Sequence, residues 1–368
     1  MNRSAAASRI GIEHPVVQGP FGGGLSSVAL AAAVSNAGGL GSYGAHQLSP
    51  AEIERVAGEL RAATPAPFAL NLWVSDHDEG GLTPAPDVLE RAWRVFAPYF
   101  AELGLPKPVY PERFVPYGFA AQVDAVLAAK PAVFSFVFGI AARTVLVECR
   151  RLGIVTVGAA TTIAEAQALE AAGVDLVVAT GFEAGGHRPS FLASAEASLH
   201  GTFALTQLVS SHVRIPVIAA GGIVDRRGVR AALALGASAA QVGTAFLACE
   251  ESGAGAQHRA LLFESAGGTA LTRAYTGRLA RGIRNRYLDE IGAHVAELAP
   301  YPVTGWFAGQ LKAAAQAQGR TDLGSLWSGQ VAPDPRRRHA ATLMTELVAG
   351  PDDASSPNTA RVAAHASP

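Results

Sequence analysis

The fold of this chain is decided by four short apolar runs in its middle part: VTVGAA at 155–160, LVVATG at 176–181, PVIAAGG at 216–222 and AAQVGTAF at 239–246. Each run is almost continuously apolar rather than alternating, which is typical of strands buried on both faces of a parallel sheet. The runs are separated by stretches with a helical pattern, at 162–172, 201–212 and 225–235. Because a parallel neighbour requires a crossover connection, this alternation predicts consecutive βα units.

Four earlier runs raise the number of predicted strands to eight, at 16–17, 40–44, 68–74 and 132–139. Helices are predicted after the first two, at 26–36 and 49–61, each with a serine as its N-cap. Eight βα units predict an α/β fold of the (β/α)8 TIM-barrel type. The competing open, doubly wound sheet is disfavoured, because the glycine run at 19–24 is not followed by the acidic residue that a dinucleotide-binding fold carries on its second strand.

The chain is 368 residues long, whereas a typical TIM barrel has about 250. We expect one domain spanning 1–349, with the surplus assigned to particular segments. A proline-rich insertion at 76–115, with one short helical stretch, follows the third strand and is expected to form a lid or a wall. A mainly helical segment at 250–345 is appended to the barrel, and the small, polar residues 350–368 are predicted to be a disordered tail.

The formal net charge of −1 leaves no broad basic field, so neither nucleic acid nor anionic lipid is an expected partner. The dense basic run at 336–338 is interpreted as a solvated face. Cys149 and Cys249 are far apart and belong to no cluster with zinc-ligand spacing, so we expect neither a disulfide scaffold nor a metal site. Without an apolar stretch of about 18 residues, the sequence predicts no membrane segment, and we expect a cytoplasmic protein.

Glycines gather at the ends of the seventh and eighth predicted strands, as Gly221-Gly222 and Gly243-Thr244. In TIM barrels the loops after these strands commonly bind a phosphate group through backbone N–H groups. The strand ends carry neither a P-loop nor a pair of carboxylates, so phosphoryl transfer and glycoside hydrolysis are not expected. A phosphate site without phosphate chemistry indicates a cofactor held by its phosphate, and FMN fits best.

Two polar residues near strand ends are candidates for the chemistry itself. His187 lies in TGFEAGGHRPS, a glycine-rich loop that begins at Thr180, and it could accept a proton there at neutral pH. Asn71 interrupts the third strand and is either a satisfied strand-end amide or a hydrogen-bond partner of a flavin ring. We interpret the other nine histidines as structural or surface residues, and Glu183 and Arg188 as braces of the loop or as surface charges.

Several motifs together resemble those of the class I nitronate monooxygenases, formerly called 2-nitropropane dioxygenases. They follow one another along most of the chain: QGPFGG at 18–23, NLWV at 71–74, TGFEAGGHRPSF at 180–191, IPVIAAGGI at 215–223, AAQVGTAFLACEES at 239–252, TGRLARGIRNRY at 276–287, YPVTGWFAGQLKAAA at 301–315 and LWSGQ at 326–330. A series of this length is far more specific than a single glycine motif.

The resemblance implies an FMN enzyme that oxidises nitronates, such as propionate 3-nitronate or alkyl nitronates, with O2 to a carbonyl compound and nitrite. It implies a route through a flavin semiquinone and without a nicotinamide. The family's active-site histidine corresponds to His187, as the base or as the group that orients the substrate. Donors to the anionic substrate could come from Tyr275, Arg278 and Arg281, although these arginines could equally form structural hydrogen bonds. The implied flavin contacts are Gly22, Asn71, Thr180, Gly185, Gly221, Gly222, Gln241, Val242, Gly243 and Thr244.

Two positions depart from the family pattern. Thr180 stands where many members have glutamine, which shortens or removes one contact to the flavin ring. Ile140-Ala141 follow the SFVFG motif at 135–139, where the family usually has proline.

Two other functions remain open at this point. One is another FMN enzyme on the same scaffold, an NAD(P)H-dependent quinone reductase or an enoyl-thioester reductase. The other is a flavin-free barrel that binds a phosphorylated metabolite or acts as a partner protein. The sequence also leaves the oligomeric state open, a homodimer included.

Overall fold

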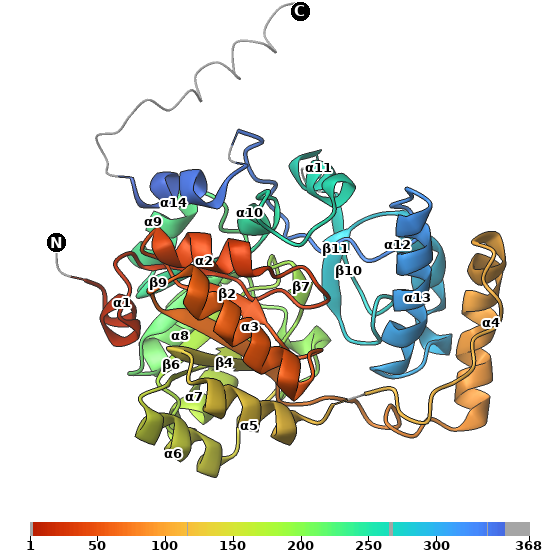
Figure 1. Ribbon diagram of the computed structural model, residues 1–368, viewed down its shortest axis with the longest axis horizontal. Coiled ribbons are helices and arrows are strands. Elements are labelled where there is room, and N and C mark those ends of the chain that lie inside the picture. Colours follow the sequence, from red (N-terminus) through yellow and green to blue (C-terminus); the bar gives the residue numbers. More distant parts are fainter. Residues whose placement is uncertain (1–2, 116, 265–267, 337, 350–368) are drawn as a thin grey trace, which may run out of the picture.

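Eight parallel strands form one sheet in the computed structural model, which describes residues 3–115, 117–264, 268–336 and 338–349. The strands are β1 (Val16–Gln18), β2 (Gly41–Gly44), β3 (Phe68–Trp73), β4 (Val133–Val137), β5 (Val155–Ala160), β6 (Leu176–Thr180), β8 (Val217–Ala220) and β9 (Ala239–Val242). They pair in the order β1-β9-β8-β6-β5-β4-β3-β2, and a parallel bridge between Val17 and Leu40 closes the ring. Figure 1 shows this sheet with helices packed around it. The predicted TIM barrel and its eight strands are confirmed. The predicted tail at 350–368 and Arg337 of the basic run lie outside the described residues.

Burial on both faces explains why the strands are continuously apolar. Every residue of β5 and β6 is buried. One core cluster joins residues at the starts of several strands, Val133, Val155 and Leu176 among them, to the N-terminal helix α1 (Ala5–Ile10). The helix therefore covers the end of the barrel where the strands begin, and the opposite end is available for a site.

The crossover helices surround the sheet: α2 (Val28–Asn36), α3 (Pro50–Ala63), α5 (Phe119–Ala129), α6 (Arg143–Leu152), α7 (Ile163–Ala172), α8 (Thr202–His212) and α9 (Arg226–Ala234). Their starts follow from polar caps. Ser27 accepts a hydrogen bond from the N–H of Leu30 at the start of α2. Ser49 and Glu52 cap each other's backbone N–H groups at the start of α3. The two predicted helices are thus confirmed with serine caps, and they span 28–36 and 50–63 instead of 26–36 and 49–61.

The segment after the barrel is largely helical, as expected, and it also contributes a β-hairpin that was not predicted. Its helices are α11 (Ala256–Glu264), α12 (Arg286–Glu290), η2 (Ile291–Glu297, a 3₁₀ helix), α13 (Val303–Ala317) and α14 (Ala340–Val348). The hairpin consists of β10 (Thr269–Thr272) and β11 (Ala280–Ile283). β11 also pairs antiparallel with β7 (Gly186–His187), which lies in the loop after β6. Strands this short, with arginine and glycine in β11, show no period-two apolar pattern from which they could be predicted.

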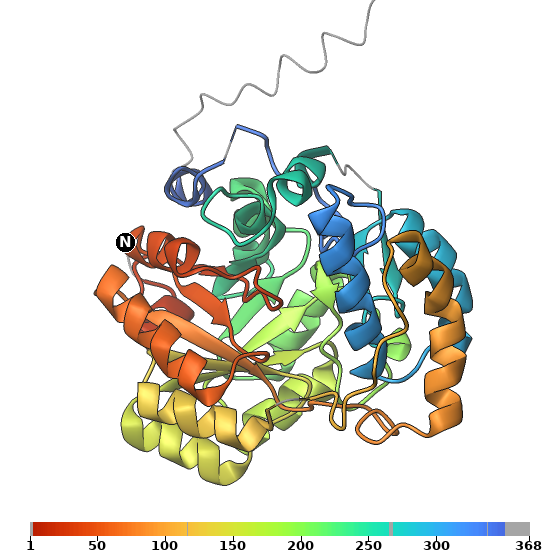
Figure 2. The same cartoon turned by 45° about the vertical axis from the view of Figure 1, so that its right-hand side comes forward.

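The insertion at 76–115 packs against the appended segment. Its helix α4 (Pro86–Glu102) lies beside α13 and η2, on the side of the molecule shown at the right of Figure 2. Phe96 of α4 stacks on Phe307 of α13 with the ring centroids 4.9 Å apart, and both side chains are fully buried. The insertion and the appended segment therefore share a second hydrophobic core next to the barrel.

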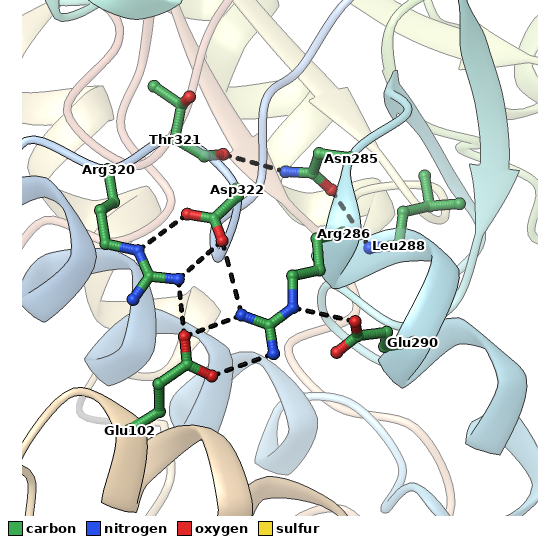
Figure 3. A network of polar contacts seen from close by, with 8 residues as sticks. All are labelled: Glu102, Asn285, Arg286, Leu288, Glu290, Arg320, Thr321 and Asp322. Atoms are coloured by element: carbon green, nitrogen blue, oxygen red, sulfur yellow. Dashed lines mark hydrogen bonds and ion pairs between the residues drawn. The ribbon is translucent and has the colours of Figure 1, made fainter.

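A network of ion pairs holds the end of α4 to this segment (Figure 3). The Glu102 carboxylate accepts hydrogen bonds from Arg286 at 2.7 Å and from Arg320 at 2.8 Å. Arg286 also donates to Glu290, and Arg320 donates to Asp322. The hydrogen bonds from Arg286 and Arg320 hold the pKa of Glu102 down at about 2. One carboxylate therefore forms ion pairs with two guanidinium groups that come from different parts of the chain.

Replacing Glu102 by Gln should lower the melting temperature by about 1–2 °C at low salt, and by less in about 1 M NaCl. Folding lowers the pKa of Glu102 from 4.5 to about 2, so its contribution to stability is complete above pH 4.5 and is lost as the pH falls through about 2. The control is Glu59→Gln, because Glu59 pairs with Arg55 at 2.6 Å in an exposed position. Melting curves at two salt concentrations measure both variants, and equal losses would contradict a special role of the network.

Candidate active site

A cavity of about 510 Å³ opens where the barrel strands end. Its wall is formed by the loops after the strands together with parts of the segments 301–316 and 325–331. TIM barrels carry their sites at this end. The predicted site residues that line the cavity are Gly22, Asn71, Thr180, Gly185, His187, Gly221, Gly222, Gln241, Gly243, Thr244 and Tyr275. Val242, Arg278 and Arg281 do not line it; Val242 is buried in the core between the barrel and its helices.

His187 enters the cavity on β7 and is held at both its backbone and its ring. Its backbone pairs with Ala280 of β11. Its Nε2 lies 2.8 Å from Oγ1 of Thr276, which belongs to the turn of the β10–β11 hairpin. Two indole rings flank the imidazole, with centroids 4.8 Å away for Trp73 and 5.0 Å away for Trp327. The ring is therefore confined to one place in the cavity.

The cavity keeps its histidines uncharged. Burial, followed by the electrostatic effects of Arg278 and His46, lowers the pKa of His187 from 6.5 to about 3. Burial and then Arg278 lower the pKa of His46 to about 3 as well. At physiological pH, His187 is consequently a neutral imidazole that can accept a proton or a hydrogen bond.

His46 is a second histidine in the cavity, and it was not predicted as a site residue. It follows β2, and its ring stacks on Trp73 with the centroids 4.0 Å apart and an interplanar angle of 6°. This position requires glycine at residue 22, because a Cβ there would lie 2.0 Å from Cε1 of His46. The sequence could have indicated His46, because it lies in the loop after a barrel strand, as His187 does.

Glu183 and Arg188 brace the loop that carries His187, which is the first of the two roles that the sequence allowed for them. Glu183 accepts hydrogen bonds from the backbone N–H of Thr202 at 2.9 Å and from its hydroxyl at 2.9 Å. Arg188 donates to the carbonyl oxygens of Thr180 at 2.8 Å and Ser198 at 2.9 Å. These bonds tie the loop to β6 and to the start of α8.

The two arginines considered as substrate donors are bonded to protein groups. Arg281 donates through Nε to the carbonyl oxygen of Phe182 at 2.9 Å, so it braces the same loop. Arg278 donates through Nε to Asp78 at 3.0 Å, and its guanidinium lies 4.2 Å from the ring centroid of Tyr301. Of the two roles that the sequence allowed for these arginines, the structure favours the structural one.

Tyr275 lines the cavity, but its hydroxyl already donates to the carbonyl oxygen of Ile283 at 3.2 Å. An unpredicted cation, Lys312 of α13, lines the same cavity beside the small residues Gly305 and Ala308. Burial lowers the pKa of the Lys312 ammonium, and no carboxylate among the described residues pairs with it. Lys312 is the only charged residue of α13. A single charge in an otherwise uncharged helix is the sequence signal that could have indicated Lys312 as a site residue.

The residues at the strand ends are compatible with a flavin. Asn71 donates through Nδ2 to Ser135 at 2.9 Å, which orients its carboxamide in the cavity wall. At Gly185 a Cβ would lie 2.6 Å from the backbone nitrogen of Gly329, so glycine is needed for the loop to pass there. Thr244 accepts a hydrogen bond from that N–H of Gly329 at 2.8 Å. The strand-end loops and the segment near 329 thus form one continuous wall along the cavity.

Comparison with known proteins decides the family. A profile described as nitronate monooxygenase matches residues 3–350. The chain belongs to the nitronate monooxygenase family. It is 42% identical to the nitronate monooxygenase of Paraburkholderia phytofirmans over 344 residues, which are 92% of each chain. It is also 42% identical to the Pseudomonas aeruginosa nitronate monooxygenase, over 92% of this chain and 96% of the relative.

Two solved structures share this fold. The nitroalkane oxidase of Streptomyces ansochromogenes is 36% identical and superimposes with a TM-score of 0.81, covering 94% of this chain and 98% of the other. FabK from Thermotoga maritima is 27% identical with a TM-score of 0.71, covering 94% and 95%. The resemblance seen in the motifs is therefore confirmed, and this family member is a flavin-dependent oxidoreductase built on a TIM barrel.

The structure also places the segments around the site of this nitronate monooxygenase family member. None of the described residues of the insertion 76–115 lines the cavity; the insertion packs into the second core, and its role as a lid or a wall of the site stays a prediction. Within the described ranges, no helix has both the length and the apolar character that crossing a bilayer would require.

Substituting Gly185 by Ala should damage the cavity wall, because the new Cβ would lie 2.6 Å from backbone atoms of Gly329 and Ser328. We expect a loss of about 1–3 kcal/mol in the free energy of unfolding, together with weaker retention of flavin. Denaturant unfolding and flavin titration measure the two effects. Gly58→Ala is the control, since Gly58 is an exposed helical residue with nothing within 4 Å of its added Cβ. Flavin binding as tight as in the wild type would contradict this function of Gly185.

Proposed function

We propose that this enzyme binds FMN in the cavity and oxidises nitronates with O2 to a carbonyl compound and nitrite. The observation that carries the proposal is the position of His187: a neutral imidazole, confined between two tryptophans, in the same cavity as the glycine-rich strand ends. Membership of the nitronate monooxygenase family supports the reaction class.

The residues of the barrel ends would hold the cofactor. Asn71, Thr180 and Gly185 would contact the flavin ring, and the loops at Gly222 and Gly243 would bind the phosphate. Glycine allows the backbone to approach a phosphate closely, and the loops after the last two barrel strands are where TIM barrels commonly bind one. A bound flavin supplies the chemistry that side chains lack, because it accepts electrons from the substrate and transfers them to O2.

His187 acts on the substrate. With a neutral nitroalkane, its imidazole takes the α-proton, and the electron pair of the broken C–H bond becomes part of the C=N bond of the nitronate. The imidazolium formed in this way pairs with the anionic nitronate oxygens. A substrate supplied as the nitronate needs no proton abstraction, so it depends less on His187.

The charge of the cavity fits an anion. Lys312 lines the cavity without a carboxylate partner among the described residues, whereas the charge of Arg278 is paired with Asp78. The two imidazoles remain neutral and do not contribute charge. This arrangement supports propionate 3-nitronate, which carries a carboxylate besides the nitronate, as a better substrate than alkyl nitronates.

Nitrite release tests the proposed reaction. The purified FMN enzyme should consume O2 and release nitrite from propionate 3-nitronate at the same rate with and without NADH or NADPH. Under anaerobic conditions, NADH and NADPH should leave the flavin oxidised. Bleaching without nitrite release would instead favour an NAD(P)H-dependent reductase, and a colourless protein that takes up no FMN would favour a flavin-free binding function.

His187→Asn tests the role of the imidazole. The variant should retain FMN but lose about 100-fold in kcat/KM with a neutral nitroalkane, because general base catalysis is removed. The loss with a preformed nitronate should be much smaller. The control is His212→Asn, since the exposed His212 bonds to the carbonyl oxygen of Leu208 on α8. Wild-type activity of His187→Asn on both substrates would contradict the assigned role.

A further inference from the structure

Thr276 is the partner of the His187 ring. In the part of the chain that the structure describes, it is the one side chain hydrogen-bonded to this imidazole, with 2.8 Å between Oγ1 and Nε2. It lies in the turn between β10 and β11 and lines the cavity. The hairpin that pairs with the backbone of His187 therefore also supplies the partner of its side chain.

The other contacts of Thr276 indicate where the imidazole carries its hydrogen. The backbone N–H of Arg278 donates to Oγ1 at 3.3 Å, and the hydroxyl can donate to the carbonyl oxygen of Arg278 at 3.5 Å. A hydroxyl has one hydrogen and two acceptor positions. When the Thr276 hydroxyl donates its hydrogen to the Arg278 carbonyl oxygen, Oγ1 can accept hydrogen bonds from both Arg278 N–H and His187 Nε2–H. The one donor and the two acceptor positions of the hydroxyl are then all occupied. Donation to Nε2 instead would give up the carbonyl bond and leave one acceptor position empty.

We propose that Thr276 is a positioning residue that holds neutral His187 in the tautomer with its hydrogen on Nε2. The lone pair then resides on Nδ1, which has no partner among the described residues and is not sealed off from the cavity. The inference rests on the proposed function, in which this lone pair takes the α-proton of the substrate. As the new N–H bond forms at Nδ1, Nε2–H stays bonded to Oγ1, so the side of the ring facing Thr276 needs no proton transfer.

The neighbours of Thr276 restrict its side chain. Gly305 of α13 faces its methyl group, with 3.6 Å between Cγ2 and the place where a glycine Cβ would be. The adjacent Gly277 has φ of +93°, and a Cβ there would lie 2.7 Å from the backbone nitrogen of Tyr301, so this turn is packed closely against the start of α13. The hydroxyl direction is thus set by the packing of the hairpin.

Among the residues that the structure describes, no side chain other than Thr276 is hydrogen-bonded to Nε2 of His187. The ring of His46 is stacked on the face of Trp73. The guanidinium of Arg278 is bonded to Asp78 and Ser75. Losing the Thr276 hydroxyl would therefore leave both tautomers of His187 accessible, and only one of them presents a lone pair at Nδ1.

Two variants separate the hydrogen bond from the shape of the side chain. Thr276→Val keeps the branched shape and removes the oxygen, whereas Thr276→Ser keeps the hydroxyl and removes the methyl group. ¹⁵N NMR of protein labelled at histidine reports the tautomer directly, with the His187 signals identified by their loss in His187→Asn. We expect the Nε2–H tautomer in the wild type and in Thr276→Ser, and a mixture of tautomers in Thr276→Val.

Kinetics provide the second readout. Thr276→Val should lower kcat/KM for a neutral nitroalkane by about fivefold, the effect of one hydrogen bond, and Thr276→Ser should recover most of this loss. FMN affinity and turnover of a preformed nitronate should change little in both. If Thr276→Val does not fold, as judged by its melting temperature and flavin content, Thr276→Ala replaces it in the same measurements.

Two results would overturn the proposal: an unchanged His187 tautomer in Thr276→Val, or a loss in Thr276→Ser as large as that in Thr276→Val. Failure of the proposed function looks different. In that case the wild type releases no nitrite from either substrate, while the NMR experiment still decides whether Thr276 sets the tautomer.

Discussion

The antiparallel pairing of β7 with β11 is the constraint on which the site depends. A strand of two residues, Gly186 and His187, cannot hold its own conformation inside a glycine-rich loop. The partner strand comes from the segment appended after the barrel and fixes the backbone of the histidine. The same strand carries Arg281, whose side chain bonds to the loop carbonyl of Phe182. The barrel therefore provides the cavity, and the appended segment determines where the imidazole stands in it.

The apolar walls of the cavity have a direct chemical consequence. Trp73 and Trp327 pack against His187, and burial there keeps the imidazole neutral far below its ordinary pKa. Positive charge is still present in the cavity wall at Lys312, while Arg278 is paired with Asp78. The site thus separates two tasks, because the ammonium of Lys312 attracts an anion while the imidazole of His187 remains uncharged.

The second core supports the appended segment, which positions His187 through β11. Phe96 of the insertion and Phe307 of α13 pack face to face, and Glu102 joins the two arginines of the neighbouring segments. The start of α13 in turn supports the hairpin turn through Gly305, which faces Thr276. The insertion is therefore linked to the position of His187 through packed side chains, although its own described residues do not reach the cavity surface.

The sequence by itself determined the barrel, because strands buried on both faces must be continuously apolar and the helices between them must start at polar caps. It also indicated His187 and the glycine pairs, since residues at the ends of parallel barrel strands necessarily meet at one end. Only the tertiary structure decided that His46 and Lys312 share this cavity, that Arg278 and Arg281 are bonded to protein groups, and that Thr276 is the partner of His187. These contacts join residues far apart in the chain, and hydrogen-bond partners and burial depend on distances in space that no local pattern of residues contains.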